Sequence, residues 1–186
     1  MPSLPSGMDK LLKEHFDRFM EKGMLPPELA RDKRLHGCTL FNDREKLAIW
    51  RNNFKGLRYE HDDIRLRGAI DNLLVTGTQL IILDYKTRGY PLKDDSHLYY
   101  QDQLDLYAFL LKQNGYTVAP YAYLLFYHPV QVTETGEVVF ETDMVQMDVS
   151  PDHARELLAN AMTVLAGDIP DAAEECQFCQ WAKDAT

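Results

Sequence analysis

Residues 68–86 read GAIDNLLVTGTQLIILDYK, and this stretch decides the fold. Two runs rich in Val, Ile and Leu flank the sequence TGT, a pattern that predicts two buried antiparallel strands. Gly77 and Thr78 suit a two-residue hairpin turn, because glycine adopts a positive φ without steric cost. A turn at these two residues sets the register of the hairpin, and that register pairs Asp71 with Asp84.

This pairing brings two carboxylates and a lysine onto one face of an apolar hairpin. Paired residues have Cβ atoms about 5 Å apart. Lys86 projects from the same face as Asp84, while Tyr85 points to the opposite face. Like charges across a ladder are destabilising, and a divalent cation such as Mg²⁺ removes the conflict because one or two carboxylates commonly hold it. A second interpretation stays open, in which Asp84 and Lys86 form a structural ion pair at the end of a strand.

The composition is that of a globular chain whose positive charge is concentrated around this hairpin. Its 186 residues suffice for a sizeable core, so we expect one domain over residues 1–186, with a short tail at 168–186. The net charge is −9, yet residues 31–93 carry 13 Lys and Arg against 8 Asp and Glu. This local basic excess favours a phosphate-bearing substrate.

No segment predicts membrane insertion or export. No apolar run reaches transmembrane length, so we expect no membrane partner. The first twenty residues are charged and amphipathic, unlike a signal peptide. Three cysteines, an odd number, do not suggest a disulfide framework. We therefore expect a reducing, cytoplasmic location.

The remainder of the chain alternates between helical and strand patterns. Beside the hairpin, the predicted helices are 8–22, 43–53, 98–113 and 151–166, and the predicted strands are 57–66, 119–128 and 138–149. The first strand would form a meander with the hairpin, and its polar sequence EHDD at 60–63 predicts an edge position or a bend. This order predicts an α/β or α+β fold with a central mixed sheet flanked by helices.

The helix predicted over 98–113 carries a polar residue on its apolar face. Gln103 lies one turn before Tyr107 on that face. A polar amide in such a place needs a hydrogen-bond partner. Two interpretations are open: Gln103 bonds to the backbone in the core, or both side chains project towards the carboxylates.

Three short motifs resemble those of the PD-(D/E)xK nuclease superfamily, in the branch that contains the RecB-type exonuclease domain and the CRISPR-associated adaptation exonucleases. The motifs are Gly68-x-Ile70-Asp71, Asp84-Tyr85-Lys86-Thr87 and Gln103-x-x-x-Tyr107. The resemblance implies a restriction-endonuclease-like core. It also implies DNA as the substrate and metal-assisted hydrolysis of phosphodiester bonds.

The resemblance implies a role for each motif residue. Asp71 and Asp84 would bind Mg²⁺ or Mn²⁺ together with the backbone carbonyl of Tyr85. Lys86 would orient the attacking water and stabilise the negative charge of the transition state. The residues that would complete the site or contact the DNA backbone are Gln103 and Tyr107.

Relatives also place an acid or a histidine on an N-terminal helix as a further metal ligand. We assign this role to Glu45, on the helix predicted over 43–53. Three other residues remain alternatives, because spacing alone does not identify the ligand. They are Asp43, His36 and Glu60.

Some relatives bind a [4Fe–4S] cluster through one N-terminal cysteine and three cysteines near the C-terminus. Here His15 lies where the first cysteine would be, and the tail has only Cys176 and Cys179. Zinc and cubane clusters normally take four ligands, and Cys38 with His15 or His36 would complete such a set. Reduced thiols, a zinc site and an iron–sulfur site all remain open.

The sequence thus predicts a metal-dependent, exonuclease-like DNA nuclease. One alternative is a weak or inactive nuclease-fold module that binds DNA or a protein partner, and another is a hydrolase of a different phosphate ester. An open basic groove beside the carboxylates would favour DNA. A chain of this length is also compatible with action alongside a helicase or another subunit of a repair or CRISPR-type system.

Overall fold

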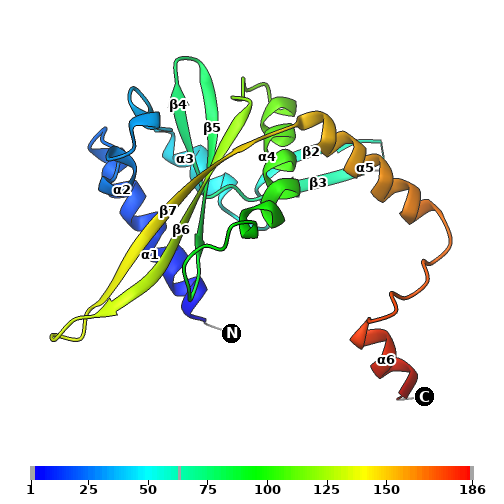
Figure 1. The fold of residues 1–186 in the computed structure, drawn as a ribbon. Coiled ribbons are helices and arrows are strands. Elements are labelled where there is room, and N and C mark those ends of the chain that lie inside the picture. Colours follow the sequence, from blue (N-terminus) through cyan, green and yellow to red (C-terminus); the bar gives the residue numbers. More distant parts are fainter. Residues whose placement is uncertain (1–2, 63, 185–186) are drawn as a thin grey trace. The chain divides into compact units, whose positions relative to one another are not determined.

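The computed structural model describes residues 3–62 and 64–184, which form two compact units divided after Ala154. The first unit contains the five-stranded sheet and most of the helices (Figure 1). Its helices are α1 Leu4–Glu21, α2 Pro27–Ala30, α3 Arg44–Trp50 and α4 Gln101–Gln113, with the short 3₁₀ helices η1 Lys33–Leu35 and η2 Ser96–Tyr100. Its strands are β1 Thr39–Leu40, β2 Leu57–His61, β3 Ile64–Gly68, β4 Asn72–Thr76, β5 Gln79–Thr87, β6 Tyr121–Val132 and β7 Val138–Asp148.

The main sheet is mixed, with the strand order β1-β4-β5-β6-β7. Strands β5 and β6 are parallel and are connected through α4, whereas the other neighbours are antiparallel. The predicted α/β fold with a central mixed sheet flanked by helices is therefore confirmed, and it is consistent with a restriction-endonuclease-like core.

The predicted register of the central hairpin is confirmed. Strand β4 pairs with β5 from Asn72–Leu83 at one end to Thr76–Gln79 at the turn. Gly77 has a φ of +56°, which is the left-handed conformation that the turn requires. In this register, the positions that follow the Asn72–Leu83 pair are Asp71 and Asp84.

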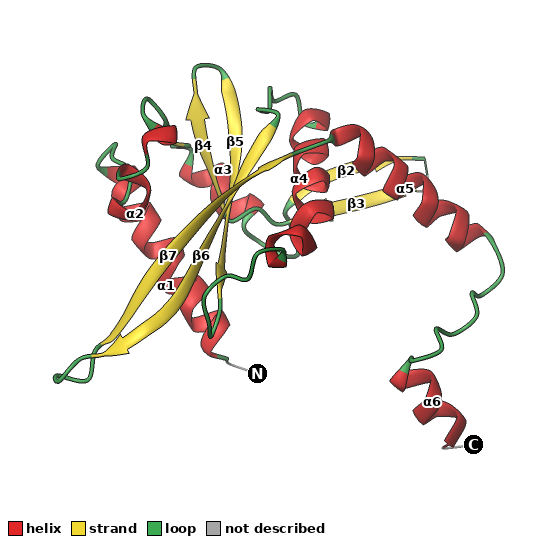
Figure 2. Cartoon of the chain, viewed as in Figure 1, coloured by secondary structure: helices red, strands yellow, loops and turns green. Residues whose placement is uncertain are grey.

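The single strand predicted over 57–66 and its meander with the hairpin are wrong, whereas the bend predicted at its polar sequence is confirmed. The chain turns back within the EHDD sequence, where Asp62 has a φ of +49°, and residue 63 lies outside the described residues. Strands β2 and β3 form a separate two-stranded sheet, which lies beside α4 (Figure 2). The reversal leaves Glu60 and Asp62 exposed, as expected for charged side chains, which are rarely buried without partners.

Helices α1 and α4 flank opposite faces of β5. Phe16 of α1 stacks on Tyr85 with ring centroids 5.0 Å apart. The next residue, Lys86, points to the other face and reaches Gln103 of α4. Helix α1 begins earlier than predicted because Ser3 is its N-cap and forms a capping box with Ser6.

The second unit contains most of α5, Pro151–Ala166, and the terminal helix α6, Gln177–Asp184. The predicted helix over 151–166 is confirmed. In the described part of the chain, no helix is both long enough and apolar enough to cross a membrane.

Gly68 is the place where the end of β3 packs most closely against α4. A Cβ atom at this residue would lie 2.7 Å from Leu110 Cδ1 and 3.0 Å from Tyr107 Cε1. Distances this short force neighbouring side chains to move. The glycine therefore sets the spacing between α4 and the chain segment that leads to Asp71.

We expect Gly68→Ala to lower the free energy of unfolding by about 1–3 kcal/mol, the usual cost of overpacking a core. The measurement is chemical denaturation followed by circular dichroism. Gly89→Ala is the matched control, because a Cβ at Gly89 meets nothing within 4 Å. Equal stability of the two variants would contradict the packing argument.

Candidate active site

The three sequence motifs meet in one hydrogen-bonded cluster between the hairpin and α4. Lys86 Nζ lies 2.6 Å from Asp84 Oδ2 and donates to Gln103 Oε1 at 3.1 Å. Gln103 Nε2 donates to Tyr107 Oη at 2.7 Å and to Asp84 Oδ1 at 3.4 Å. Tyr107 Oη in turn donates to the carbonyl oxygen of Ala69 at 2.5 Å. The amide on the apolar face of α4 therefore projects towards the carboxylates.

Asp84 is the most buried charged residue of this cluster, with 1% of its surface exposed. Burial and, to a smaller extent, the negative charge of Asp71 together raise its pKa to about 7, although Lys86 opposes the shift. The buried Oδ2 of Asp84 is engaged by Lys86 through this ion pair, and among the described residues it accepts no further hydrogen bond.

Asp71 is bound by a lysine from the N-terminal helix. Lys13 Nζ lies 3.3 Å from Asp71 Oδ1 and 2.8 Å from Asp9 Oδ2. Burial raises the pKa of Asp71, the charge of Lys13 lowers it, and the charge of Asp9 raises it. The sequence analysis missed Asp9 and Lys13. Their i, i+4 spacing predicts that they share a helix face, but it does not identify what that face meets.

Arg51, at the end of α3, holds the backbone beside Asp71. Its Nε donates to the carbonyl oxygen of Asp71 at 2.7 Å, and its Nη1 donates to Asp17 Oδ1 of α1 at 2.8 Å. Its Nη2 is buried and has no hydrogen-bond partner among the described residues. Arg51 was also missed, because no local pattern joins residues so far apart in the sequence.

Lys86 and Tyr85 occupy contrasting environments on successive positions of β5. Lys86 Nζ lies 4.7 Å from the centre of the Tyr100 ring, and its side chain is 20% exposed. The Tyr85 ring is buried against α1, and burial raises the pKa of its hydroxyl. Only the lysine of this pair can approach a ligand in solvent through its side chain.

The oxygen atoms of this site suit a hard divalent cation. Asp84 Oδ2 is a buried acceptor that only Lys86 engages among the described residues, and Asp71 supplies a second carboxylate. No group of three or more His, Cys, Asp or Glu able to hold a metal ion occurs within residues 3–62 and 64–184. Two carboxylates are sufficient for Mg²⁺, which usually keeps several waters and binds substrate phosphates as well.

The structure does not bring Glu45 into this group. Glu45 is exposed in the first turn of α3. Of the alternatives, Asp43 caps the same helix by accepting from Lys46 N at 3.0 Å, and His36 is exposed. Glu60 is exposed on β2. The further ligand on the N-terminal side thus stays a prediction.

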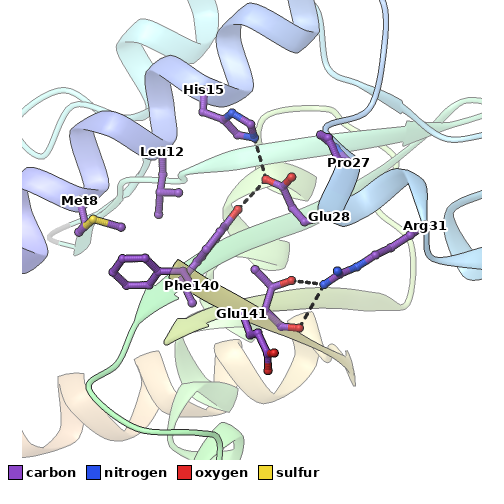
Figure 3. Close-up of a pocket in the computed structure, with 10 residues that line it drawn as sticks. Met8, Leu12, His15, Pro27, Glu28, Arg31, Phe140 and Glu141 are labelled. Atoms are coloured by element: carbon purple, nitrogen blue, oxygen red, sulfur yellow. Dashed lines mark hydrogen bonds and ion pairs between the residues drawn. The ribbon is translucent and has the colours of Figure 1, made fainter. Parts of the chain in front are cut away.

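His15 has a partner of its own in a pocket of about 530 Å³ between α1, α2 and the β6–β7 strands. Its Nε2 lies 2.8 Å from Glu28 Oε1, which also accepts from Tyr127 Oη at 2.8 Å (Figure 3). Apolar groups from Met8 and Phe140 line the same pocket. His15 is therefore already hydrogen-bonded without any cysteine.

The three cysteines are divided between the two units. Cys38 lies in the first unit, and burial raises the pKa of its thiol. Cys176 and Cys179 lie in the second unit at the start of α6, where hydrogen bonds from the Cys179 backbone and thiol lower the pKa of Cys176. The predicted metal site that joins these cysteines with His15 or His36 stays a prediction.

Fold and site together describe a class of protein: a mixed α/β domain that presents two acids and a lysine at the ends of central strands. The model of the PD-(D/E)XK nuclease superfamily matches residues 3–183, and the chain belongs to this superfamily. Its members are generally nucleases, and they typically use divalent metal ions. A search of curated proteins and a search of solved structures each gave no match.

The raised pKa of Asp84 predicts how a neutral substitution changes stability with pH. The folded protein binds the Asp84 proton more tightly than the unfolded chain, so the contribution of this group to stability falls as pH rises from about 4 to about 7. Asp84→Asn removes this pH-dependent decrease in stability, because asparagine does not ionise. In the presence of EDTA, we expect the variant to melt about 2–8 °C above the wild type at pH 8.5, the shift that 1–2 kcal/mol produces in a domain of this size.

At pH 5 the same comparison should give nearly equal melting temperatures, because folded Asp84 is then protonated and neutral like asparagine. Differential scanning calorimetry at both pH values measures the difference. A difference in melting temperature between variant and wild type that is the same at pH 5 and pH 8.5 would contradict the assigned environment of Asp84.

Proposed function

We propose that this protein is a metal-dependent DNA nuclease of the RecB-like branch, acting as an exonuclease on DNA ends. The observation that carries the proposal is the cluster in which Lys86 contacts both Asp84 and Gln103. The motifs with RecB-like spacing supply all of its side chains. The branch is supported by this spacing, and the superfamily match supports a nuclease.

In this proposal, the carboxylates of Asp71 and Asp84 and the Tyr85 carbonyl hold Mg²⁺ or Mn²⁺. When bound, the ion would stabilise negative charge on the phosphoryl oxygens and lower the pKa of a bound water. It would also compensate the charge that burial makes unfavourable on Asp84. This part of the proposal follows from the carboxylate and carbonyl oxygens and from the buried Asp84 Oδ2, which has no partner besides Lys86 among the described residues.

Lys86 is the group that acts on the reacting atoms. Its ammonium is held between the Asp84 carboxylate, the Gln103 amide oxygen and the Tyr100 ring, so its three donors are only partly used. We propose that it orients the water that attacks phosphorus and stabilises the charge that develops there. Cleavage breaks the bond between phosphorus and the leaving oxygen, which takes a proton.

Gln103 and Tyr107 are positioning residues in this scheme. Gln103 fixes Lys86, and Tyr107 fixes both Gln103 and the Ala69 carbonyl. Lys13 and Arg51 hold Asp71 from the other side through its carboxylate and its backbone. The acids therefore approach each other on a scaffold that is anchored to both flanking helices.

Two observations favour a second candidate function. Asp71 is engaged by Lys13, and Glu45 lies exposed on α3. A nuclease-fold module that binds DNA or a protein partner with little hydrolysis would have such a site.

We further propose that the tail at 168–186 belongs to the same domain, because the family match reaches residue 183. A cytoplasmic setting and a helicase or other repair or CRISPR-type subunit remain expectations.

The test is a nuclease assay on linear single-stranded, linear double-stranded and circular DNA with Mg²⁺ or Mn²⁺. We expect the wild type to degrade linear DNA. Lys86→Ala and Asp84→Ala should each lower the rate at least about 100-fold, because each removes charge stabilisation that operates in the transition state. Lys112→Ala is the matched control, since Lys112 is exposed at the far end of α4.

Three results would contradict the proposal. Unchanged cleavage by Lys86→Ala would remove the assigned mechanism. Absence of cleavage by the wild type, together with DNA binding, would favour the binding module. Rapid cutting of circular DNA would exclude a strict requirement for ends.

A further inference from the structure

The β2–β3 hairpin has one apolar face and one charged face. Tyr59 lies on the apolar face and packs edge-on against Phe109 of α4, with ring centroids 5.0 Å apart. Because side chains alternate along a strand, the neighbouring residues point to solvent. These exposed residues are Arg58, Glu60, Arg65 and Arg67, and we call them the arginine face.

The pairing of the hairpin places one pair of like charges and one pair of opposite charges across the ladder on this face. Arg58 is directly opposite Arg67, and Glu60 is directly opposite Arg65. Like charges directly opposite in a ladder destabilise it, and this face carries an excess of positive charge in a chain whose net charge is −9. Packing does not require these arginines, because the face is exposed. An anionic ligand would relieve their repulsion.

The loop before β2 holds two of these arginines in place. Arg67 Nη1 donates to the carbonyl oxygen of Phe54 at 2.6 Å, and Arg58 Nη2 donates to the same oxygen at 3.3 Å. Asn52 Oδ1 accepts from the backbone N–H of Phe54 at 2.8 Å and of Lys55 at 2.9 Å, which fixes the loop. The guanidinium groups are therefore positioned before any ligand arrives.

The same loop presents an aromatic ring to solvent. The Phe54 side chain is 80% exposed, although a phenylalanine gains by burial. A shallow depression of about 340 Å³ lies on the arginine face. Among the described residues, the side chain of Arg65 has no hydrogen-bond or ion-pair partner, although its backbone pairs within the ladder. The surface thus presents the guanidinium group of Arg65, the two guanidinium groups of Arg58 and Arg67 that hydrogen bonds hold in place, and the exposed aromatic ring of Phe54.

Such a surface has the chemistry that single-stranded nucleic acid requires. Basic side chains that follow the backbone and aromatic rings that stack on unpaired bases are the two components of single-strand binding. A duplex would satisfy the arginines but not the ring, because its bases are already stacked.

We propose that the arginine face and Phe54 bind a single-stranded DNA segment beside the active site, with the arginines on phosphates and the ring on a base. This inference rests on the proposed function and names its substrate form. Strand β3 leads directly to the site, since the Cα atoms of Arg67 and Asp71 lie at most about 15 Å apart along four peptide units. DNA held on this face is therefore close to the carboxylates.

The test uses the full chain, a fluorescently labelled thymidine oligonucleotide, and anisotropy measured in EDTA so that no cleavage occurs. We expect Arg65→Ala, which removes no internal contact, to weaken binding several-fold and Arg65→Ala/Arg67→Ala to weaken it at least about tenfold. The double variant should also lower the slope of log affinity against log salt by about 1.4. Phe54→Ala should weaken single-strand binding by about five- to a hundredfold and leave duplex binding unchanged.

Lys22→Ala/Lys33→Ala is the matched control, because it removes two exposed positive charges at the end of α1 and on η1, outside the arginine face. The inference is overturned if the arginine variants weaken binding no more than this control, if Phe54→Ala binds like the wild type, or if the wild type binds no single strand. If the wild type cleaves DNA and the variants behave like it, only the inference fails. If the arginine face binds DNA as expected but no cleavage occurs with metal, only the proposed nuclease activity fails.

Discussion

The constraint on which this structure depends is the burial of Asp84 next to a second carboxylate. An apolar hairpin with the register set by Gly77 leaves the Asp84 side chain almost without solvent, and Asp71 adds a second negative charge nearby. Each of these conditions disfavours the ionised form. The surroundings of the hairpin therefore have to supply positive charge and hydrogen bonds.

The two flanking helices supply them in different ways. From α4, Gln103 donates to Asp84 and holds Lys86 beside it. From α1, Lys13 contacts Asp71 and is shared with Asp9. These contacts compensate only part of the cost, since the pKa of both acids remains raised. In the proposed function, a divalent cation would compensate the remaining excess of negative charge.

The parts of the fold that could be predicted are those that local pattern determines. The turn at Gly77, the alternation along the hairpin and the amide at Gln103 led to the register and to the cluster with α4. The contacts of Lys13 and Arg51 with Asp71 could not be predicted, because they depend on how α1 and α3 pack against the sheet. The β2–β3 hairpin was misread as one strand, because a short acidic reversal resembles a polar stretch at a sheet edge.

The central claim is that Asp71 and Asp84 form a cation site that is partly protonated near neutral pH. Calorimetric titration of the wild type with Mn²⁺, in buffers of different ionisation enthalpy, measures the protons released on binding. The account predicts release of about one proton per ion at pH 6, very little release at pH 8.5, and much weaker binding by Asp84→Asn. Release that is equal at both pH values, or unchanged binding by Asp84→Asn, would contradict it.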